Sequence, residues 1–278
     1  MKPTRPIIRY HGGKWKLAYW IISNFAEHKV YVEPYGGGGS VLLKKQRAYA
    51  EIYNDLDGEV VNLFKVARDN GEALIRALEL TPFAKDEFIE SWHPSDDALE
   101  QARRTVVRSF MGFGSAAVTM RRNARGTTGA PGTGFRSNST RTGTIPAHDW
   151  ASYPTHLSAI IKRLQGVVIE NRDAIEVMKQ HDSEKTLHYV DPPYVSTTRD
   201  KGRDYVYEMS EQDHVNLAEF LHTLKGHVVL SGYRCDLYDQ LYQKWTRVDR
   251  KAFADGASPR VESLWVSHEL NQKEIHFK

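Results

Sequence analysis

The chain has little cysteine, no long apolar run and, over one long stretch, no acidic residue. Cys235 is the single cysteine among 278 residues, which excludes an internal disulfide and a zinc site built on cysteines. No apolar segment approaches the length of a membrane span, and residues 1–10 lack the apolar core of a signal peptide. We therefore expect a cytoplasmic protein that has no contact with a membrane.

The acid-free stretch, residues 101–148, is rich in arginine. Its eight arginines are Arg103, Arg104, Arg108, Arg121, Arg122, Arg125, Arg136 and Arg141. The whole chain has a formal net charge of +3, so these arginines leave −5 for the residues outside the stretch. A local positive field attracts polyanions, and Phe110, Phe113 and Phe135 lie among the arginines, which is unusual for an all-polar linker. We interpret the stretch as nucleic-acid-binding; a solvated basic loop is the alternative.

Short apolar runs alternate with amphipathic stretches on both sides of this region, which predicts an α/β fold. We expect strands at 30–35, 51–57, 166–173, 186–190 and 227–233, and a closing antiparallel hairpin at 246–253 and 261–268. The alternation lapses between residues 81 and 164, which we interpret as an insertion that forms a small lobe. Ser95 or Asp96 is expected to cap a helix at 98–110, and Ser210 with Asp213 to cap another.

The strand at 186–190 ends at Asp191, Pro192, Pro193 and Tyr194. Because proline has no backbone N–H, the strand cannot continue, and the acid and the aromatic ring fall at its carboxyl end, where open α/β sheets bind ligands. Asp191 and the Pro192 carbonyl can each accept a hydrogen bond, and Tyr194 offers a face for stacking. These groups suit a planar base with an exocyclic amine. A rigid turn at a strand end is the alternative for Asp-Pro-Pro alone.

Two glycine-rich loops precede helices. The first strand runs into Glu33, Pro34, Tyr35, Gly36, Gly37, Gly38, Gly39 and Ser40. Strand, glycine turn and helix form the first half of a nucleotide-binding unit, although the spacing is not G-x-G-x-x-G. Near the N-terminus, Gly12 and Gly13 precede Lys14 and can present N–H groups and an ammonium to an anion.

Acids and a polar loop complete the motifs. Asp55 follows the second strand, where such folds bind ribose hydroxyls, and Asp57 is expected to cap the next helix. Asp173 follows another strand and would face the same crevice. Residues 195–207 form a polar loop that we interpret as a lid or as a clamp on a nucleic-acid strand.

Together these motifs resemble the DNA adenine-N6 methyltransferases of the Dam-like, D12 class over nearly the whole chain. Residues 10–14 are similar to the family's Trp-Ala-Gly-Gly-Lys, 32–40 to its Val-Glu-Pro-Phe-x-Gly-x-Gly-Ser, and 191–194 to its catalytic motif. The order of cofactor motif, insertion and catalytic motif is that of the α group. Tyr10 and His11 replace Trp-Ala, and the arginine-rich insertion has its own sequence, so no target site is carried over.

The resemblance implies a Rossmann-like class I methyltransferase sheet formed by residues 1–80 and 165–278. Residues 81–164 would be an inserted, mainly helical and loop target-recognition lobe. S-adenosyl-L-methionine would be the methyl donor and double-stranded DNA the substrate, with no metal required. The protein would be a monomer when free and encoded by a bacterium or a phage.

The resemblance also assigns the site residues. Catalysis is expected from Asp191, Pro192, Pro193 and Tyr194. The cofactor is expected to contact Tyr10, Gly12, Gly13, Lys14, Glu33, Pro34, Tyr35, Gly36, Gly37, Gly38, Gly39, Ser40, Asp55, Asp173 and Asp191. DNA is expected to contact Lys14, Arg108, Arg121, Arg122, Arg125, Arg136, Asn138, Arg141, Thr197, Arg199 and Tyr205.

Three other functions compete with DNA adenine methylation. RNA adenine or a protein glutamine could be the methyl acceptor, although the glutamine enzymes that the chain resembles carry Asn at the position of Asp191. A nucleic-acid-binding module that has kept the fold without the chemistry is the third, and the intact Asp191–Tyr194 motif and glycine turn argue against it.

Overall fold

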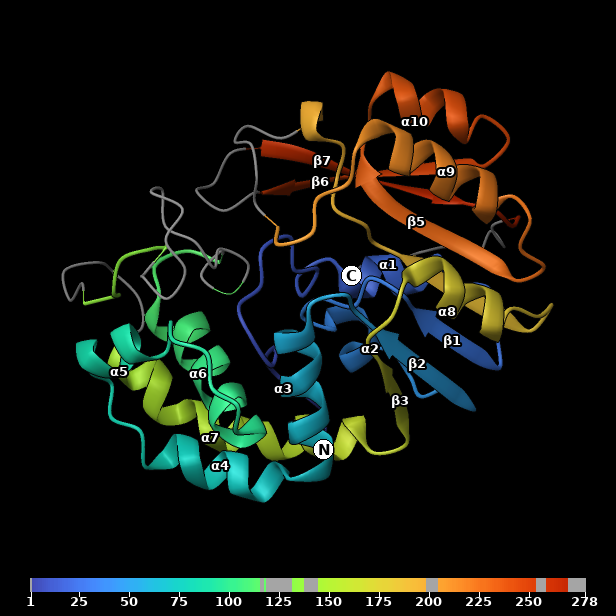
Figure 1. Cartoon of the computed structure of the whole chain (residues 1–278). Helices are drawn as coiled ribbons and strands as arrows, with labels where there is room; N and C mark the ends of the chain where they lie inside the picture. The colour runs from blue at the N-terminus through green and yellow to red at the C-terminus, as the bar shows by residue number, and fades with distance from the viewer. Residues whose placement is uncertain are drawn as a thin grey trace, which may run out of the picture.

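The computed structural model describes residues 2–115, 118, 132–137, 145–198, 205–253 and 259–269 (Figure 1). A seven-stranded sheet in the order β3-β2-β1-β4-β5-β7-β6 forms its centre. The strands are β1 (Val30–Glu33), β2 (Ala50–Asn54), β3 (Val167–Glu170), β4 (Thr186–Val190), β5 (His227–Tyr233), β6 (Thr246–Phe253) and β7 (Pro259–Val266). β1 to β5 pair in parallel, while β7 is antiparallel to both β5 and β6. The predicted α/β fold and its closing hairpin are confirmed.

The chain changes direction across the sheet between β1 and β4. From β1 it runs outward to the edge strand β3, and it then returns to pair β4 with β1, so that Val30 lies beside Thr186 and Val32 beside His188. At such a switch point the connections on the two strands diverge and leave a crevice at their carboxyl ends. The glycine turn after β1 and Asp191 after β4 therefore meet at one edge of the sheet.

Helices cover both faces of the sheet, because successive strand residues point to opposite faces. Val32 belongs to a buried cluster with residues of α8 (Ala174–His181), α9 (Glu211–Leu221) and α10 (Asp236–Leu241). Its neighbour Tyr31 belongs to the cluster on the other face, with α1 (Ala18–Ser23) and α2 (Ser40–Lys44). No helix of the described residues is both long enough and apolar enough to cross a membrane.

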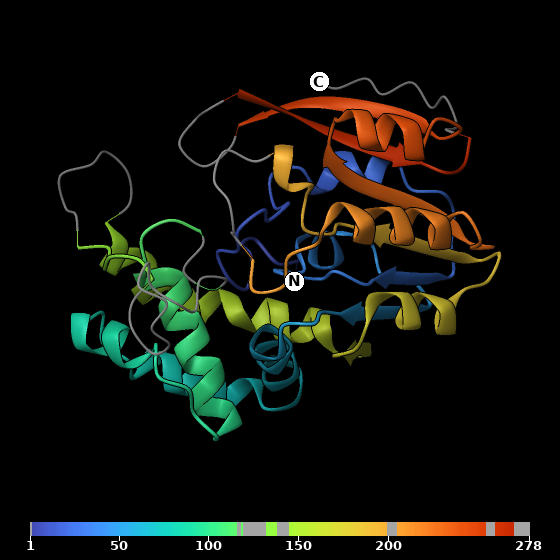
Figure 2. The ribbon, with the colours of Figure 1, turned by 45° about the horizontal axis from the view of Figure 1, so that its top comes forward.

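Five further helices extend the cluster that contains Tyr31 and form a helical lobe. They are α3 (Gly58–Asp69), α4 (Gly71–Glu79), α5 (Lys85–Glu90), α6 (Ala98–Met111) and α7 (Pro146–Leu164). Figures 1 and 2 show this lobe at the opposite end of the molecule from the β6–β7 hairpin. α3 and α4 both pack against α6 and α7, so helices on either side of the expected boundary at residues 80 and 81 share one core. The division at 81–164 stays a prediction.

The sequence analysis did not predict α7, a helix of 19 residues with Pro154 inside it. An internal proline normally argues against a helix because it removes a hydrogen bond, whereas Pro146 in the first turn is favourable. Burial outweighs that cost: Trp150 and Tyr153 lie in the core, and the Tyr153 hydroxyl donates to the carbonyl of Ile7 at 2.6 Å.

Two helix caps were predicted with different success. Ser210 and Asp213 form a capping box at the start of α9, as expected. The cap of α6 is Asp97, whose carboxylate accepts a backbone N–H at 2.7 Å, so the prediction of Ser95 or Asp96 is wrong by one or two residues. Ser95, Asp96 and Asp97 are all residue types that cap helices well, so the sequence does not distinguish them. The backbone geometry decides which of them is the N-cap.

A buried ionic cluster ties α7 to the sheet. Arg163 donates to both carboxylate oxygens of Glu51 on β2, at 2.6 and 2.8 Å, and to the carbonyl of Leu42 at 2.7 Å. Lys45 lies 2.7 Å from the same carboxylate, whose side chain is 1% exposed. Burial alone would raise the pKa of Glu51, but the bonds from Arg163 and Lys45 outweigh it and lower that pKa.

We predict that Arg163→Ala lowers the free energy of unfolding by about 3–5 kcal/mol, because it leaves the Glu51 carboxylate buried with one cation fewer. Lys162→Ala on the exposed side of the same helix should change it by about 0.5 kcal/mol or less. Urea unfolding followed by circular dichroism measures both. A loss below about 1 kcal/mol in Arg163→Ala would show that the cluster does not hold α7 to the sheet.

Candidate active site

The glycine turn after β1 is shaped by the aromatic rings around it. Gly37 has φ +47°, and a Cβ there would lie 2.7 Å from the ring of Tyr10. A Cβ on Gly36 would lie 2.1 Å from the ring of Tyr53, so neither position has room for a side chain. The Tyr53 hydroxyl donates to the Gly37 carbonyl at 2.7 Å. The turn therefore lines the crevice with backbone and without side chains.

Asp55 fastens this turn to the end of β2. Its carboxylate accepts the Gly37 N–H at 2.8 Å and the Asp57 N–H at 2.7 Å. Asp57 in turn accepts two N–H groups as the N-cap of α3, as predicted. Buried Asn54 completes the connection, since its side chain bonds the carbonyl of Pro34 at 2.9 Å and both backbone groups of Arg172. The carboxyl ends of β1, β2 and β3 are thus held together by side chains of β2 and its following turn.

Glu33, the last residue of β1, is 2% exposed. One of its oxygens accepts the Tyr31 hydroxyl at 2.7 Å and the Leu42 N–H at 2.9 Å, which anchors α2. Burial outweighs these hydrogen bonds and raises the pKa of Glu33 to about 8. The carboxyl group is therefore a protonated, neutral acid over much of the physiological range.

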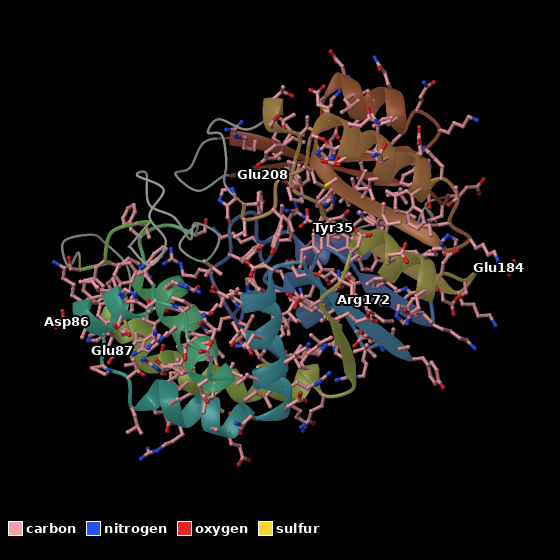
Figure 3. The ribbon with its side chains drawn as sticks, viewed as in Figure 1. Tyr35, Asp86, Glu87, Arg172, Glu184 and Glu208 are labelled. Atoms are coloured by element: carbon pink, nitrogen blue, oxygen red, sulfur yellow. The ribbon has the colours of Figure 1, made fainter. Side chains whose placement is uncertain are left out.

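A cavity of about 910 Å³, counted with its mouth, opens at this edge of the sheet. Its lining includes most of the predicted cofactor residues: Tyr10, Gly12, Gly13, Lys14, Glu33, Pro34, Tyr35, Gly36, Gly37, Gly38, Ser40, Asp55 and Asp191. The far wall comes from residues 205–209 and Tyr189. Tyr35 and Glu208, two residues of the lining, are labelled in Figure 3.

Two predicted cofactor residues are not part of that lining. Gly39 has φ +58° and a Cβ there would lie 2.8 Å from Phe64, so it serves the packing behind the turn. Asp173 is exposed and caps α8, accepting the N–H groups of Ile175 at 2.9 Å and Glu176 at 3.2 Å. Its neighbour Ala174 lines the cavity, so Asp173 stands at the border of the site.

Asp191 lies where the cavity meets a buried ionic group. Its Oδ2 is 3.0 Å from the Lys14 ammonium, which also donates to the Gly12 carbonyl at 2.7 Å and lies 3.6 Å from Glu262. The pKa of Lys14 is raised: burial opposes the charge, but Asp191 and Glu262 outweigh it. Oδ1 of Asp191 is buried and has no hydrogen-bond partner among the described residues. The carboxylate therefore has one oxygen to which no described part of the chain donates.

Tyr194 is more enclosed than the sequence analysis expected. The side chain is 7% exposed, the Lys14 ammonium lies 4.8 Å from its ring centroid, and the ring of Tyr233 meets it edge-on at 4.8 Å. Its hydroxyl donates to Glu262 and lies 3.1 Å from the Ser231 hydroxyl. Tyr194 does not line the cavity, so the open stacking face expected from sequence is covered in this structure.

The sequence analysis missed Glu262 and Ser231. They come from β7 and β5, far in sequence from Asp191, and both are buried. Glu262 did leave a signal: it alternates with Leu264 and Val266 on an apolar strand, and a carboxylate on the inward face of a strand requires a partner.

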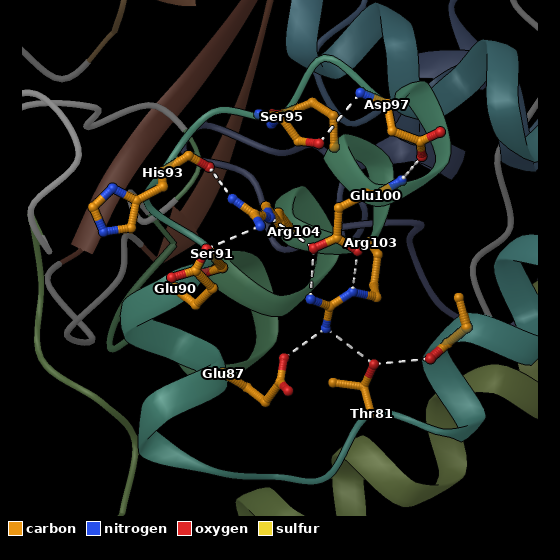
Figure 4. A network of polar contacts seen from close by, with 12 residues as sticks. Thr81, Glu87, Glu90, Ser91, His93, Ser95, Asp97, Glu100, Arg103 and Arg104 are labelled. Carbon is orange, nitrogen blue, oxygen red and sulfur yellow. Dashed lines mark hydrogen bonds and ion pairs between the residues drawn. The ribbon is translucent and has the colours of Figure 1, made fainter.

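The arginine-rich stretch is partly neutralised inside the helical lobe. Arg103 donates to Glu100 at 2.7 and 2.8 Å and to Glu87 at 2.7 Å, while Arg104 donates to Glu100 at 2.7 Å and reaches Glu90 at 3.0 Å (Figure 4). Glu87, Glu90 and Glu100 come before the acid-free stretch in the sequence, and in the folded protein they pair with its first two arginines. Two of the eight arginines therefore serve α5–α6 packing.

Two further arginines of the stretch are described, and both were predicted to contact DNA. Arg108 is 2% exposed and pairs with Glu59 on α3, so its guanidinium does not reach the surface and that prediction is wrong. Arg136 donates to the Phe110 carbonyl at 2.9 Å with a side chain 20% exposed. The remaining predicted DNA contacts of the lobe and loop lie outside the described residues: Arg121, Arg122, Arg125, Asn138, Arg141 and Arg199.

The other three predicted DNA contacts occupy different places. Lys14 is buried beside Asp191, and Tyr205 lines the cavity with its hydroxyl against Gly12. Their contacts with DNA stay predictions. Thr197 is exposed and lines a second hollow together with residues at the ends of β5 and β7. Its assignment stays a prediction.

Comparison with known proteins agrees with this geometry. The model of the D12 class N6 adenine-specific DNA methyltransferases matches residues 10–255. The chain is also 21% identical over 270 residues to the type II methyltransferase M.MjaIII of Methanocaldococcus jannaschii, across 86% of this chain and 88% of that protein. Because the family model covers most of its length, the chain belongs to the D12 class, whose reaction is methylation of adenine N6 in DNA.

We predict that Glu33 makes stability depend on pH. Because its pKa is about 8 in the folded protein and 4.5 in a free side chain, the folded state holds an extra proton between those values. The resulting stabilisation is complete below pH 4.5 and is lost as pH rises toward 8 and above. Relative to Glu33→Gln, the wild type should lose on the order of 3 kcal/mol of unfolding free energy between pH 5 and 8.

Urea unfolding of the two proteins at several pH values measures this difference. Glu72→Gln, at an exposed glutamate of α4, is the matched control and should follow the wild type at every pH. Parallel curves for Glu33→Gln and the wild type would show that Glu33 is ionised in the folded protein.

Proposed function

We propose that the protein transfers the methyl group of S-adenosyl-L-methionine to N6 of adenine in double-stranded DNA. Membership of the D12 class supports the reaction, and the site supports its chemistry. The observation that carries the proposal is the Oδ1 atom of Asp191, a residue of the cavity lining: this atom is buried and has no hydrogen-bond partner in the described part of the chain. An acceptor of this kind is retained where a ligand supplies the donor.

The cavity suits the charges of S-adenosyl-L-methionine, which supplies an electrophilic methyl group when bound. Asp55, Asp57, Asp191 and Glu208 give the lining an acidic character that complements a cationic sulfonium and ammonium. The bare backbone of the glycine turn allows close approach of a ligand. We assign the ribose to Asp55 and the adenine of the cofactor to the region of Asp173 and Ala174.

Asp191 would act on the amine of the target base. The lone pair of an adenine amine is delocalised into the ring, which makes the nitrogen a poor nucleophile. When Asp191 Oδ1 and the Pro192 carbonyl accept the two N6 hydrogens, they favour the pyramidal nitrogen that attacks the methyl carbon. These acceptors stabilise the positive charge that develops on nitrogen in the transition state. Lys14 leaves Oδ1 available because it holds Oδ2 at 3.0 Å.

A base inside a duplex cannot reach this site, so the target adenine would be flipped out of the helix. We assign its stacking to Tyr194. The Lys14 ammonium covers one face of that ring at 4.8 Å, so stacking on this face requires the ammonium to move. Pro193 lines the cavity, and its fixed φ sets the direction of the turn between Asp191 and Tyr194.

DNA recognition would fall to residues 81–164 and to the loop that contains Thr197 and Arg199. Arg103, Arg104 and Arg108 are engaged inside the lobe, so we assign phosphate or base contacts to Arg121, Arg122, Arg125, Arg136, Asn138 and Arg141. Site specificity, a cytoplasmic location and a monomeric free state are parts of the same proposal. Mapping N6-methyladenine by sequencing after reaction with mixed-sequence duplex DNA tests the specificity.

An assay that follows a labelled methyl group from S-adenosyl-L-methionine separates the competing acceptors. Duplex DNA, single-stranded RNA and a glutamine-containing protein fraction are compared at equal S-adenosyl-L-methionine concentration. We expect label in N6-methyladenine of the DNA. Label confined to RNA or to glutamine would replace the proposed substrate while keeping the cofactor.

We predict that Asp191→Ala lowers kcat for methylation of duplex DNA by about 100-fold or more, because the acceptor that stabilises the transition state is removed. DNA affinity should change by less than about threefold, since Asp191 lies beneath the surface. Asp249→Ala, an exposed carboxylate on β6, is the control and should methylate at the wild-type rate. Methylation by Asp191→Ala at a normal rate would refute the catalytic assignment.

We predict that replacing Arg121, Arg122 and Arg125 by alanine weakens DNA binding and flattens its dependence on salt. For each phosphate that the protein no longer neutralises, the slope of log K against log salt concentration should become shallower by about 0.9. Arg76→Ala, at an exposed arginine of α4, should leave the slope unchanged. Fluorescence anisotropy of a labelled duplex at several salt concentrations measures both, and an unaltered slope in the triple variant would remove these arginines from the interface.

A further inference from the structure

Glu262 lies in the active site although it comes from the C-terminal hairpin. It stands on β7 opposite Tyr233 of β5, and its side chain points to the same face as Leu264 and Val266. The residue is 4% exposed. It falls outside residues 10–255, the part of the chain that the family model matches. Its role therefore has to be argued from its contacts in this molecule.

The Glu262 carboxylate joins three segments of the chain. Its Oε1 accepts the Tyr194 hydroxyl from the catalytic turn and, at 3.4 Å, the Ser231 hydroxyl from β5. The same oxygen lies 3.6 Å from the Lys14 ammonium of the N-terminal loop. Two of these partners, Lys14 and Tyr194, are themselves in contact with each other.

Lys14 is shared by two carboxylates. It is 3.0 Å from Asp191 and 3.6 Å from Glu262, and its side chain is 7% exposed. A buried ammonium needs anionic partners because water cannot replace them. If Glu262 lost its charge, Asp191 would be the one remaining acidic side chain within ion-pair distance among the described residues. Asp191 would then pair more tightly with Lys14 and would be a weaker acceptor for an amine.

We propose that Glu262 is a positioning residue for methyl transfer. It holds the Tyr194 ring through the hydroxyl and shares the Lys14 ammonium with Asp191, so that Asp191 keeps Oδ2 on Lys14 and leaves Oδ1 unpaired among the described residues. When an adenine displaces Lys14 from the Tyr194 ring, Glu262 remains as its buried counter-ion. This inference rests on the proposed function, since it assigns Glu262 to that reaction.

The test is a double-mutant cycle of Glu262→Gln and Tyr194→Phe, measured as kcat and KM on duplex DNA with S-adenosyl-L-methionine. Each single change keeps the shape of the side chain, and each should lower kcat about 10- to 100-fold, the effect of losing one charge-assisted hydrogen bond. KM for S-adenosyl-L-methionine should stay within about twofold, because neither residue lines the cavity. The double variant should lose less than the product of the two factors.

Asp249→Asn provides the matched control, an acid-to-amide change on the neighbouring strand β6 that pairs with β7 at Ser263. It should keep wild-type kcat. Wild-type kcat in Glu262→Gln, or independent effects in the double variant, would overturn the inference. A raised KM for S-adenosyl-L-methionine with unchanged kcat would also overturn it, since that pattern belongs to cofactor binding.

Two further measurements separate the possible failures. Thermal unfolding of each variant shows whether a loss of kcat follows from loss of fold, and Glu262→Asp, which keeps the charge, should recover part of the rate if positioning is the role. If the wild type itself transfers no methyl group to duplex DNA, the proposed function fails. If the wild type is active and Glu262→Gln is equally active, only the role of Glu262 fails.

Discussion

The active site depends on one buried cation. Lys14 is almost without contact with solvent, and it is surrounded by Asp191, Glu262 and the ring of Tyr194. Burial of an ammonium costs several kcal/mol unless anions are fixed around it, so the three segments that carry these groups must come together for any of them to be stable. The N-terminal loop, the turn at residues 191–194 and the C-terminal hairpin are linked in this way through a charge as well as through apolar packing.

Sheet topology supplies the remaining geometry. β1 and β4 are adjacent and parallel although the helical lobe, β2 and β3 separate them in sequence, so the glycine turn and Asp191 reach the same crevice. The turn itself is held by β2, since the carboxylate of Asp55 and the hydroxyl of Tyr53 bind opposite sides of Gly37. A cofactor that rests on this backbone therefore depends on strand pairing as much as on the glycines.

Sequence patterns predicted the strands and about half of the cavity lining because those features are local. Apolar runs, glycines beside helix starts and Asp-Pro-Pro-Tyr each act within a few residues of their own position. Glu262 and Ser231 could not be found this way, since their partners are brought to them by antiparallel pairing of β5 with β7. The enclosure of Tyr194 was missed for the same reason: a motif shows which ring is present, but not which charge lies over it.

The net charge of a sequence segment also differs from the unpaired charge that the segment has in the folded protein. The stretch 101–148 has no acid of its own, yet Glu59, Glu87 and Glu100 from earlier segments neutralise the arginines at its start. An arginine in a helix with an acid one turn away is paired before DNA arrives and contributes little to counterion release. We therefore propose that affinity for a polyanion comes from arginines beyond α6, so that one half of the stretch serves stability and the other recognition.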